Sequence, residues 1–308
     1  MQIDLRLIRL YSFIQECYDN ELCWYCQRFS PNGHNGFFTD VELLTCYFFA
    51  MIEEEKHKMT GIHSYIQRYW KDWFPEIPSY QAFNNRMNRL SAVFPLFLER
   101  LSEIAMASCE HSNDFMMDSF PVILCSGKRN FSGHIWQANK GYCSSKSMYY
   151  HGVKVHCIGM RQVGCLPLPV WFQVTPASVH DAHPYKEAVR ELKGANLFAD
   201  KAYGGEENIS LANDENVTLF SPVKDKRCEP DRERFFERAY RNVMGRAVSS
   251  VRQPIESLFN WIIEKVDIQN ASKVRSSRGL DVHIMGRFSA ALMIRLGFNS
   301  PFDVDFNY

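Results

Sequence analysis

Three acidic residues in the second half of the chain have the side chains and surroundings that a divalent-cation site requires. Asp118 lies in the run DFMMDSFPVILC (residues 114–125), Asp200 follows the apolar run ANLFA (195–199), and Glu256 lies in an amphipathic segment. A carboxylate beside buried apolar residues is costly unless it is paired or binds a cation. Because Mg²⁺ prefers oxygen ligands, two or three carboxylates suffice when substrate phosphates complete the coordination. The three acids are therefore candidates for a two-ion phosphoryl-transfer site.

Residue types alone leave other assignments open. A capped or salt-bridged acid at a strand end explains Asp118 about equally well. Asp114, Asp181 and Asp214 are competing acids that spacing does not exclude. For Asp181 an N-cap role is favoured over metal binding, since a helix is expected to follow it, beginning after Pro184.

The elements that must position the acids are predicted to be strands with interspersed helices. Runs rich in Val and aromatic residues predict strands, with Pro121 closing the first and leaving Asp118 near its end. The first predicted strand begins at Asp114 and is closed by Pro121, and the later ones are residues 152–160, 168–174, 195–199 and 217–220. The order is three strands, helix, strand, helix, strand, then a long helix. This order indicates the α/β class, with a mixed sheet and flanking helices.

Glu256 is expected on the last of these helices. Apolar residues recur at helical spacing between Val251 and Val266, which predicts an amphipathic helix packed on the sheet. Pro254 places the start of the regular helix near Gln253, because proline is tolerated best in a first turn. Glu256 lies at the boundary of the apolar stripe, with Arg252 four residues earlier.

Residues 1–108 are predicted to form an all-helical N-terminal domain. TDVE at 39–42 is a capping box that opens an apolar helix running to about Glu55. Short helices further on resemble a helix-turn-helix DNA-binding unit, with Arg86 and Arg89 as its DNA contacts. A helical cap on the larger domain explains them equally well. We expect a second domain over 109–300 and a C-terminal tail over 301–308.

Charge is balanced overall but unevenly distributed. The chain has 35 basic and 35 acidic residues, yet residues 126–161 hold six Lys or Arg and no acid. Residues 224–252, taken as a basic loop leading into the helix, hold nine basic and five acidic residues. Such local basic faces suit a polyanion, which makes Lys128, Arg129 and Lys154 candidate DNA contacts.

Composition predicts a globular protein without a membrane segment. Hydrophobic residues make up 46% of the chain, the apolar runs are too short to cross a bilayer, and no signal-peptide pattern opens the sequence. We expect a cytoplasmic protein. A zinc site at Cys23 and Cys26, completed by His57 and His63, is disfavoured because no second CxxC pair accompanies it.

Five motifs resemble the catalytic domain of DDE transposases of bacterial insertion sequences. They are MDSFPV, GYCSSKSMYYHGVKVH, LPVWFQVTPASVHDAHP, LFADKAYGG and RQPIESLF. The likeness is to the insertion-sequence 982 family, within the insertion-sequence 4-related group. It covers about residues 114–295, and PSYQAFNNRMNRL (78–90) more weakly.

This resemblance implies an RNase H-like catalytic domain in which Asp118, Asp200 and Glu256 are catalytic and bind two Mg²⁺ ions, with Mn²⁺ as a substitute. It implies double-stranded DNA as the partner, both terminal inverted repeats and target DNA. We expect a homodimer on that DNA, associated with the nucleoid when bound.

One departure from the pattern concerns the residues around the third acid. The wider group often has Tyr, Arg, Glu and Lys separated by two, three and six residues. Arg252 and Glu256 keep their interval, but Ser249 and Ile263 occupy the Tyr and Lys positions. Lys265 is no replacement, since its spacing from Glu256 puts it on the opposite helix face. Arg252 and Lys201, the latter directly after Asp200, are expected to contact phosphates.

The expected activity is metal-dependent cleavage at transposon ends followed by joining of the 3′ hydroxyl to target DNA. Two alternatives stay open: an RNase H-like nuclease without joining, and a catalytically silent DNA-binding regulator of transposition. The presence of all three acids disfavours the regulator.

Overall fold

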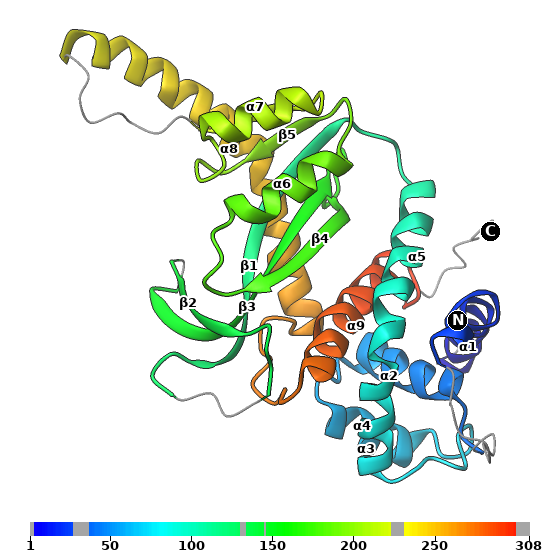
Figure 1. The fold of residues 1–308 in the computed structure, drawn as a ribbon. Coiled ribbons are helices and arrows are strands. Elements are labelled where there is room, and N and C mark those ends of the chain that lie inside the picture. Colours follow the sequence, from blue (N-terminus) through cyan, green and yellow to red (C-terminus); the bar gives the residue numbers. More distant parts are fainter. Residues whose placement is uncertain (1–2, 27–36, 130–133, 145, 223–230, 300–308) are drawn as a thin grey trace.

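The computed structural model describes residues 3–26, 37–129, 134–144, 146–222 and 231–299. A strand-rich part and a helical part lie beside each other (Figure 1). The helices are α1 (Ile3–Asn20), α2 (Asp40–Glu54), α3 (Met59–Tyr69), α4 (Tyr80–Arg89), α5 (Val93–Ala107), α6 (Ala182–Glu191), α7 (Glu206–Asp214), α8 (Asp231–Val266) and α9 (Ser277–Arg295). The strands are β1 (Asp114–Ser126), β2 (Asn139–Cys143), β3 (Met148–Met160), β4 (Leu168–Pro176), β5 (Asn196–Ala199) and β6 (Thr218–Phe220). The predicted mixed α/β class is confirmed.

The sheet has the order β2-β3-β1-β5-β6, and β4 pairs with β3 as well. β3 runs antiparallel to β1, β2 and β4, whereas β5 and β6 are parallel to β1 and to each other. One face carries Met117 and Ile158 and packs against α6 through Tyr185. The opposite face carries Phe120 and is covered by α8, whose Phe259 ring lies 4.8 Å from that of Phe120 between centroids. Both sheet faces are thus covered by helices, as is typical of sheets whose parallel strands are joined by helical crossovers.

The prediction that Pro121 closes the first strand is wrong. β1 continues to Ser126, and Pro121 lies opposite Lys154 of β3, so Asp118 is a mid-strand residue. Pairing with β5 on the other side of β1 ends at Met117. Beyond that point no strand needs an amide hydrogen from β1 on that side, and a proline is tolerated there as it is on an edge.

The predicted start of the last long helix is also wrong. α8 begins at Asp231, so Pro254 lies inside it, and residues 231–252 are helical rather than a loop. Residues 224–230 of the predicted basic loop, like the predicted tail over 301–308, lie outside the described residues. An interior proline costs about 3 kcal/mol. Burial of Val248 before it, and of Ile255, Leu258 and Ile262 after it, anchors the helix on both sides.

The helical part is closed by the last helix of the chain. α5 ends at Ala107 and the strands begin at Asp114, so the predicted boundary at 108 falls where helices give way to strands. α9 then returns to pack against α2, α4 and α5. Gly286 of α9 permits this approach, since a Cβ there would lie 2.9 Å from the Phe94 ring. The capping box at Thr39 and Glu42 is confirmed.

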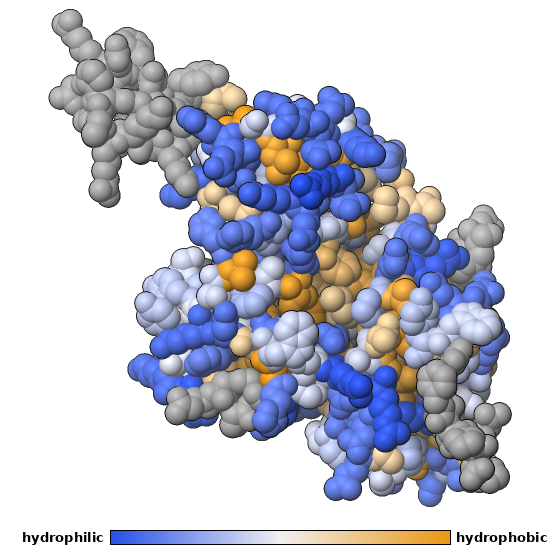
Figure 2. Space-filling view, viewed as in Figure 1, coloured by the Kyte–Doolittle hydropathy of each residue, from blue (hydrophilic) through white to orange (hydrophobic). Residues whose placement is uncertain are grey.

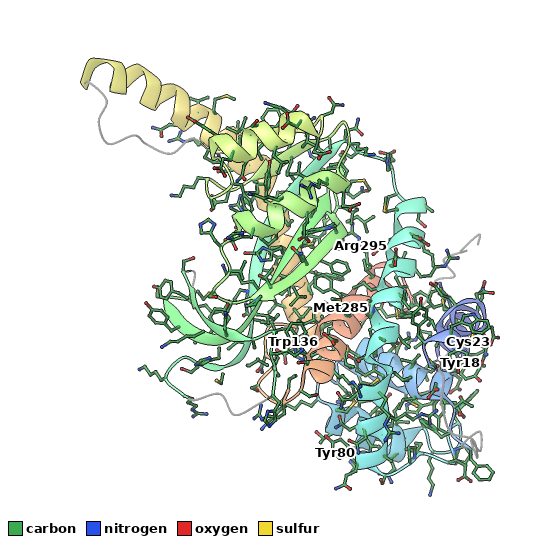
Figure 3. All side chains as sticks on the ribbon, viewed as in Figure 1. Tyr18, Cys23, Tyr80, Trp136, Met285 and Arg295 are labelled. Carbon is green, nitrogen blue, oxygen red and sulfur yellow. The ribbon has the colours of Figure 1, made fainter. Side chains whose placement is uncertain are left out.

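One apolar cluster joins the two parts. It runs from Leu7 through the sheet to Phe298. Arg295, at the end of α9, donates to the carbonyl groups of Leu166 and Pro167 before β4, and Figure 3 shows it between the helical part and the strands. Hydrophilic residues cover most of the surface in Figure 2, while apolar residues appear along the seam. The division into two domains at residue 108 stays a prediction.

Candidate active site

Asp118 and Asp200 are brought together by the register of two parallel strands. Met117 of β1 pairs with Ala199, the last residue of β5, and an aspartate follows each: Asp118 within β1 and Asp200 directly after β5. Neighbouring strands lie about 4.8 Å apart. Each carboxylate accepts a hydrogen bond from the amide of the following residue, Asp118 from Ser119 at 2.8 Å and Asp200 from Lys201 at 2.7 Å.

Arg252 of α8 links this pair to the third acid. One guanidinium nitrogen donates to Asp118 Oδ2, and the other donates to Glu256 Oε1 at 2.6 Å. Arg252 and Glu256 are four residues apart and therefore lie on the same face of the helix. The sequence reasoning left open that Arg252 is a solvated residue at a helix entry. That possibility is excluded, because the side chain is only 17% exposed and bridges two elements. We call Asp118, Asp200, Glu256 and Arg252 the acid centre.

The charges of the acid centre act on one another. Burial raises the pKa of Asp118 to about 6; Arg252 and the Ser119 amide oppose this shift, and the charges of Glu256 and Asp200 add to it. Burial lowers the pKa of Arg252, but the charges of Asp118 and Glu256 outweigh burial and the pKa is raised overall. The guanidinium therefore stays charged and neutralises carboxylates that would otherwise repel one another.

The donor set of the acid centre fits a hard divalent cation. Its three acids supply only oxygen atoms, which Mg²⁺ prefers, and the charges of Glu256 and Asp200 contribute to the raised pKa of Asp118. In the part of the chain that the structure describes, no three His, Cys, Asp or Glu side chains stand ready around one metal position. Arg252 lies between Asp118 and Glu256, two of the candidate ligands.

The competing acids are engaged elsewhere or exposed. Asp114 accepts hydrogen bonds from Asn196 (2.9 Å) and Arg161 (3.3 Å). Asp214 lies exposed at the end of α7. Asp181 precedes α6, which begins at Ala182 and not after Pro184, but its side chain makes no capping bond. It accepts from Lys154 Nζ at 3.0 Å instead, and a partly buried ammonium is a stronger donor than a helix amide.

The predicted DNA contacts fall into two groups. Lys128, Arg129, Lys201 and Arg89 are exposed and remain candidates. Arg86 and Lys154 are engaged inside the protein. Arg86 pairs with Asp40 and donates to the Phe38 carbonyl, and Lys154 pairs with Asp181 and donates to the Val179 carbonyl. Their guanidinium and ammonium groups have partners inside the protein, and their role as DNA contacts stays a prediction.

Tyr203 is a residue of this region that the sequence reasoning missed. Its side chain is 1% exposed, and its hydroxyl makes no hydrogen bond to any described residue. Burial raises its pKa, and the charges of Asp181, Asp118 and Asp200 raise it further. Its amide donates to the Asp200 carbonyl at 2.9 Å, closing a turn after β5. A tyrosine three residues after a strand-end acid was the signal in the sequence, but such a spacing alone is common.

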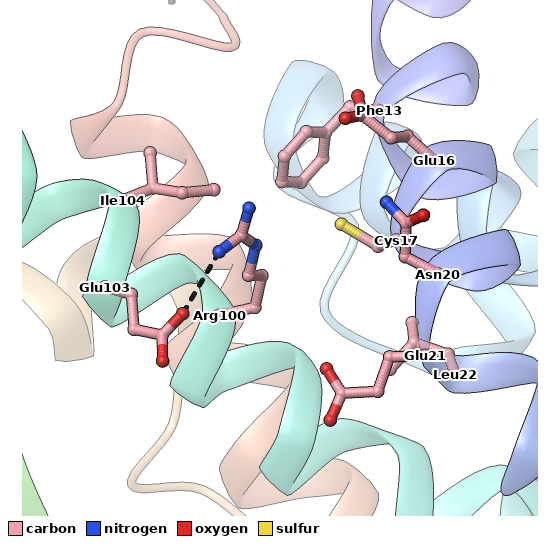
Figure 4. Close-up of a pocket in the computed structure, with 9 residues that line it drawn as sticks. All are labelled: Phe13, Glu16, Cys17, Asn20, Glu21, Leu22, Arg100, Glu103 and Ile104. Carbon is pink, nitrogen blue, oxygen red and sulfur yellow. Dashed lines mark hydrogen bonds and ion pairs between the residues drawn. The ribbon is translucent and has the colours of Figure 1, made fainter. Parts of the chain in front are cut away.

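Two further features lie away from the acid centre. The cysteine pair does not gather the histidines that were weighed for a zinc site, since His57 and His63 hydrogen-bond to the carbonyls of Lys265 and Pro78. A cavity of about 340 Å³ between α1 and α5 is lined by Glu16, Glu21, Glu103 and Arg100 among others (Figure 4).

Comparison with known protein families gives one match. Residues 113–293, more than half of the chain, match the family model described as the transposase DDE domain. The matched range contains all three acids of the acid centre and every strand of the sheet. No curated protein matches the chain in sequence. No helix among the described residues is long and apolar enough to span a membrane.

Proposed function

Because the chain belongs to the family of transposase DDE domains, we propose that it cuts DNA at transposon ends and joins the freed 3′ hydroxyl to target DNA. The observation that carries the proposal is the acid centre. Two aspartates end up side by side through strand register, and an arginine connects them to a glutamate on α8. Cleavage and joining are the same displacement at phosphorus, with water or a 3′ hydroxyl as the nucleophile, so one site serves both.

The acids of this centre are the proposed catalytic residues. Asp118, Asp200 and Glu256 would hold two Mg²⁺ ions, and Mn²⁺ would substitute. When bound, such ions activate the attacking hydroxyl and stabilise the leaving oxygen of an in-line displacement. The partly buried position of Asp118 limits water around the reacting phosphate, which strengthens the electrostatic interactions there.

Arg252 has two proposed roles in this site. Without DNA it neutralises Asp118 and Glu256, as its two hydrogen bonds show. On DNA the same planar guanidinium is suited to two oxygens of a phosphate. Lys201, exposed directly after Asp200, is proposed as a second phosphate contact.

The finer classification belongs to this proposal as well. The mixed sheet, with antiparallel strands on one side of β1 and parallel strands on the other, supports an RNase H-like fold. The five motifs support the insertion-sequence 982 family. We also propose a homodimer on DNA, a cytoplasmic location with nucleoid association, and the helices of residues 1–108 as a DNA-binding domain.

The test uses duplex DNA from the border of the element that carries the gene. The full-length protein is incubated with this DNA, a supercoiled target plasmid and Mg²⁺ or Mn²⁺, and cut and joined products are separated on a gel. The proposal expects cleavage at the border and joined products, both lost in Asp118→Asn. Cleavage without joining would favour the nuclease, and binding without cleavage in either metal would favour the silent regulator.

A further inference from the structure

The hairpin of β2 and β3 carries aromatic rings that the core does not bury. Tyr142 and Tyr149 lie directly opposite each other, 50% and 60% exposed, with ring centroids 5.0 Å apart. Cross-strand tyrosines stabilise a hairpin, but half or more of each side chain stays open to solvent. Trp136, three residues before β2, adds a third ring that is 83% exposed (Figure 3).

Basic residues lie beside Tyr149. Lys140 Nζ lies 5.2 Å from the centroid of the Tyr149 ring, a cation–π contact. The amide of Gly127 donates to the Tyr149 carbonyl at 2.8 Å, which places the next two residues, Lys128 and Arg129, beside the same tyrosine. We call Lys128, Arg129, Lys140, Tyr142 and Tyr149 the hairpin patch.

Among the described residues, no acid forms an ion pair with a cation of the hairpin patch. Residues 126–161 contain no Asp or Glu, and no described carboxylate pairs with Lys128, Arg129 or Lys140. Exposed aromatic groups beside unpaired cations mark a binding surface for a polyanion with flat or polar groups. Nucleic acid has both properties, and the cations match its phosphates in sign.

The hairpin patch faces the same side of the sheet as Asp118. Asp118 pairs with Cys157 of β3, and successive residues of a strand alternate between faces. Tyr149 is an even number of residues from Cys157 along the uninterrupted strand β3, so it points to the same side. At about 3.4 Å per residue the two positions lie roughly 27 Å apart along the strand.

This direct separation is about three-quarters of the repeat of duplex DNA, which is about 34–36 Å per helical turn. Lysine and arginine side chains add several ångströms of reach at the patch. α8 covers the sheet face between the two sites, where Val153, Val155 and Cys157 are buried. A duplex with its reacting phosphate at the acid centre therefore reaches the hairpin patch by passing outside α8, about one helical turn away.

We propose that the hairpin patch binds the sugar-phosphate backbone of the same duplex about one helical turn from the reacting phosphate. The proposal rests on the proposed function, because the acid centre supplies the other contact. The patch then sets the angle at which the duplex crosses the sheet, and it does so without reading sequence.

The test pairs two double variants of equal charge. Lys128→Gln/Lys140→Gln removes two cations of the patch. Lys186→Gln/Lys193→Gln removes two exposed cations on and after α6, which covers the opposite sheet face. Binding to a border duplex of about three helical turns is measured over a range of salt concentrations, with ethylation interference to locate the phosphates in contact.

The proposal expects the patch variant to bind about tenfold more weakly, with the salt dependence reduced by about two ions, and the control to stay within twofold. Ethylation about one turn from the cleaved phosphate should weaken wild-type binding, while ethylation half a turn away should not. In the patch variant, ethylation about one turn from the cleaved phosphate should no longer weaken binding. If wild type cuts the DNA but both variants bind equally well, the inference is overturned while the proposed function stands. If wild type does not cut it, the proposed function fails, and the interference pattern still decides whether the patch contacts DNA.

Discussion

Two sites in this molecule place one arginine among three acids. In the cavity between α1 and α5, Arg100 shares the lining with Glu16, Glu21 and Glu103 (Figure 4). In the acid centre Arg252 accompanies Asp118, Asp200 and Glu256. The residue types alone do not distinguish the two sites. The elements that contribute the side chains, and the burial of those side chains, do distinguish them.

The two arginines differ in what they connect. Arg100 pairs with Glu103, three residues on along the same helix, at 3.1 Å, and the side chains are 47% and 60% exposed. Such local surface pairs contribute about 0.5 kcal/mol or less. Arg252 is 17% exposed and bridges a strand and a helix whose residues are 134 positions apart in sequence. Convergence of distant segments on a partly buried charge therefore separates a candidate active site from an ordinary charged surface.

The two sites also differ in the group whose pKa the neighbouring charges change. In the cavity they act on Cys17, where burial raises the pKa to about 12, Arg100 lowers it and Glu16 raises it. A thiol with so high a pKa is protonated and unreactive. In the acid centre they act on Asp118, a carboxyl group whose ordinary chemistry includes cation binding.

The largest expected effect comes from the acids of the acid centre. Asp118→Asn, Asp200→Asn and Glu256→Gln each keep the shape of the side chain and remove its charge. Each should lower cleavage by at least about 10³-fold, about 4 kcal/mol, with DNA binding largely intact. The unfolding temperature of Asp118→Asn should equal or exceed that of wild type, because burial already disfavours the charged form. The measurements are single-turnover cleavage, DNA binding and thermal unfolding. Substantial cleavage by one variant would remove that residue from the site.

Arg252→Lys should have the next largest effect. Lysine keeps the charge, but its single ammonium does not reproduce two parallel contacts in fixed geometry. We expect joining of pre-cut end DNA to slow by at least about tenfold, about 1.4 kcal/mol, with the unfolding temperature close to that of wild type. Single-turnover strand transfer measures this effect. A rate within twofold of wild type would show that the positive charge alone suffices.

Asp118 shows how much of the acid centre could be predicted from the sequence. Its apolar neighbours and the run before Asp200 correctly predicted buried strands, and the helical spacing after Val251 correctly placed Glu256 on a helix. The pairing of Met117 with Ala199, which puts the aspartates side by side, depends on contacts between distant segments. Local periodicity contains no information about that register.

The errors have a common physical origin. Pro121 and Pro254 were taken as ends of elements, yet packing of the surrounding apolar residues outweighs the local cost of each proline. Arg86 and Lys154, which are predicted DNA contacts, bind Asp40 and Asp181, 46 and 27 positions away, and local sequence did not predict these partners. In each case an interaction between distant residues decided the outcome.

Cation binding should produce a smaller effect that does not depend on activity. Mg²⁺ added at several times its dissociation constant should stabilise the wild-type protein by about 1 kcal/mol, seen as a rise of a few degrees in the unfolding temperature. Glu256→Gln should show a smaller rise and Asp118→Asn none. An equal rise in all three proteins would mean that Mg²⁺ binds elsewhere, for instance at the acids of the α1–α5 cavity.

The smallest effect is expected at Arg100, which tests the cavity between α1 and α5. Arg100→Gln removes an exposed ion pair within one helix, so the free energy of unfolding should change by no more than about 0.5 kcal/mol. Cleavage and joining should stay within twofold of wild type.

Arg252→Gln, the matched change in the acid centre, leaves Asp118 and Glu256 without their shared partner and should reduce both activity and stability. Urea unfolding and the strand-transfer assay compare the two variants directly. Equal losses of stability and activity in both variants would mean that burial and convergence do not distinguish these arginines. The comparison would then no longer identify the acid centre as the candidate active site.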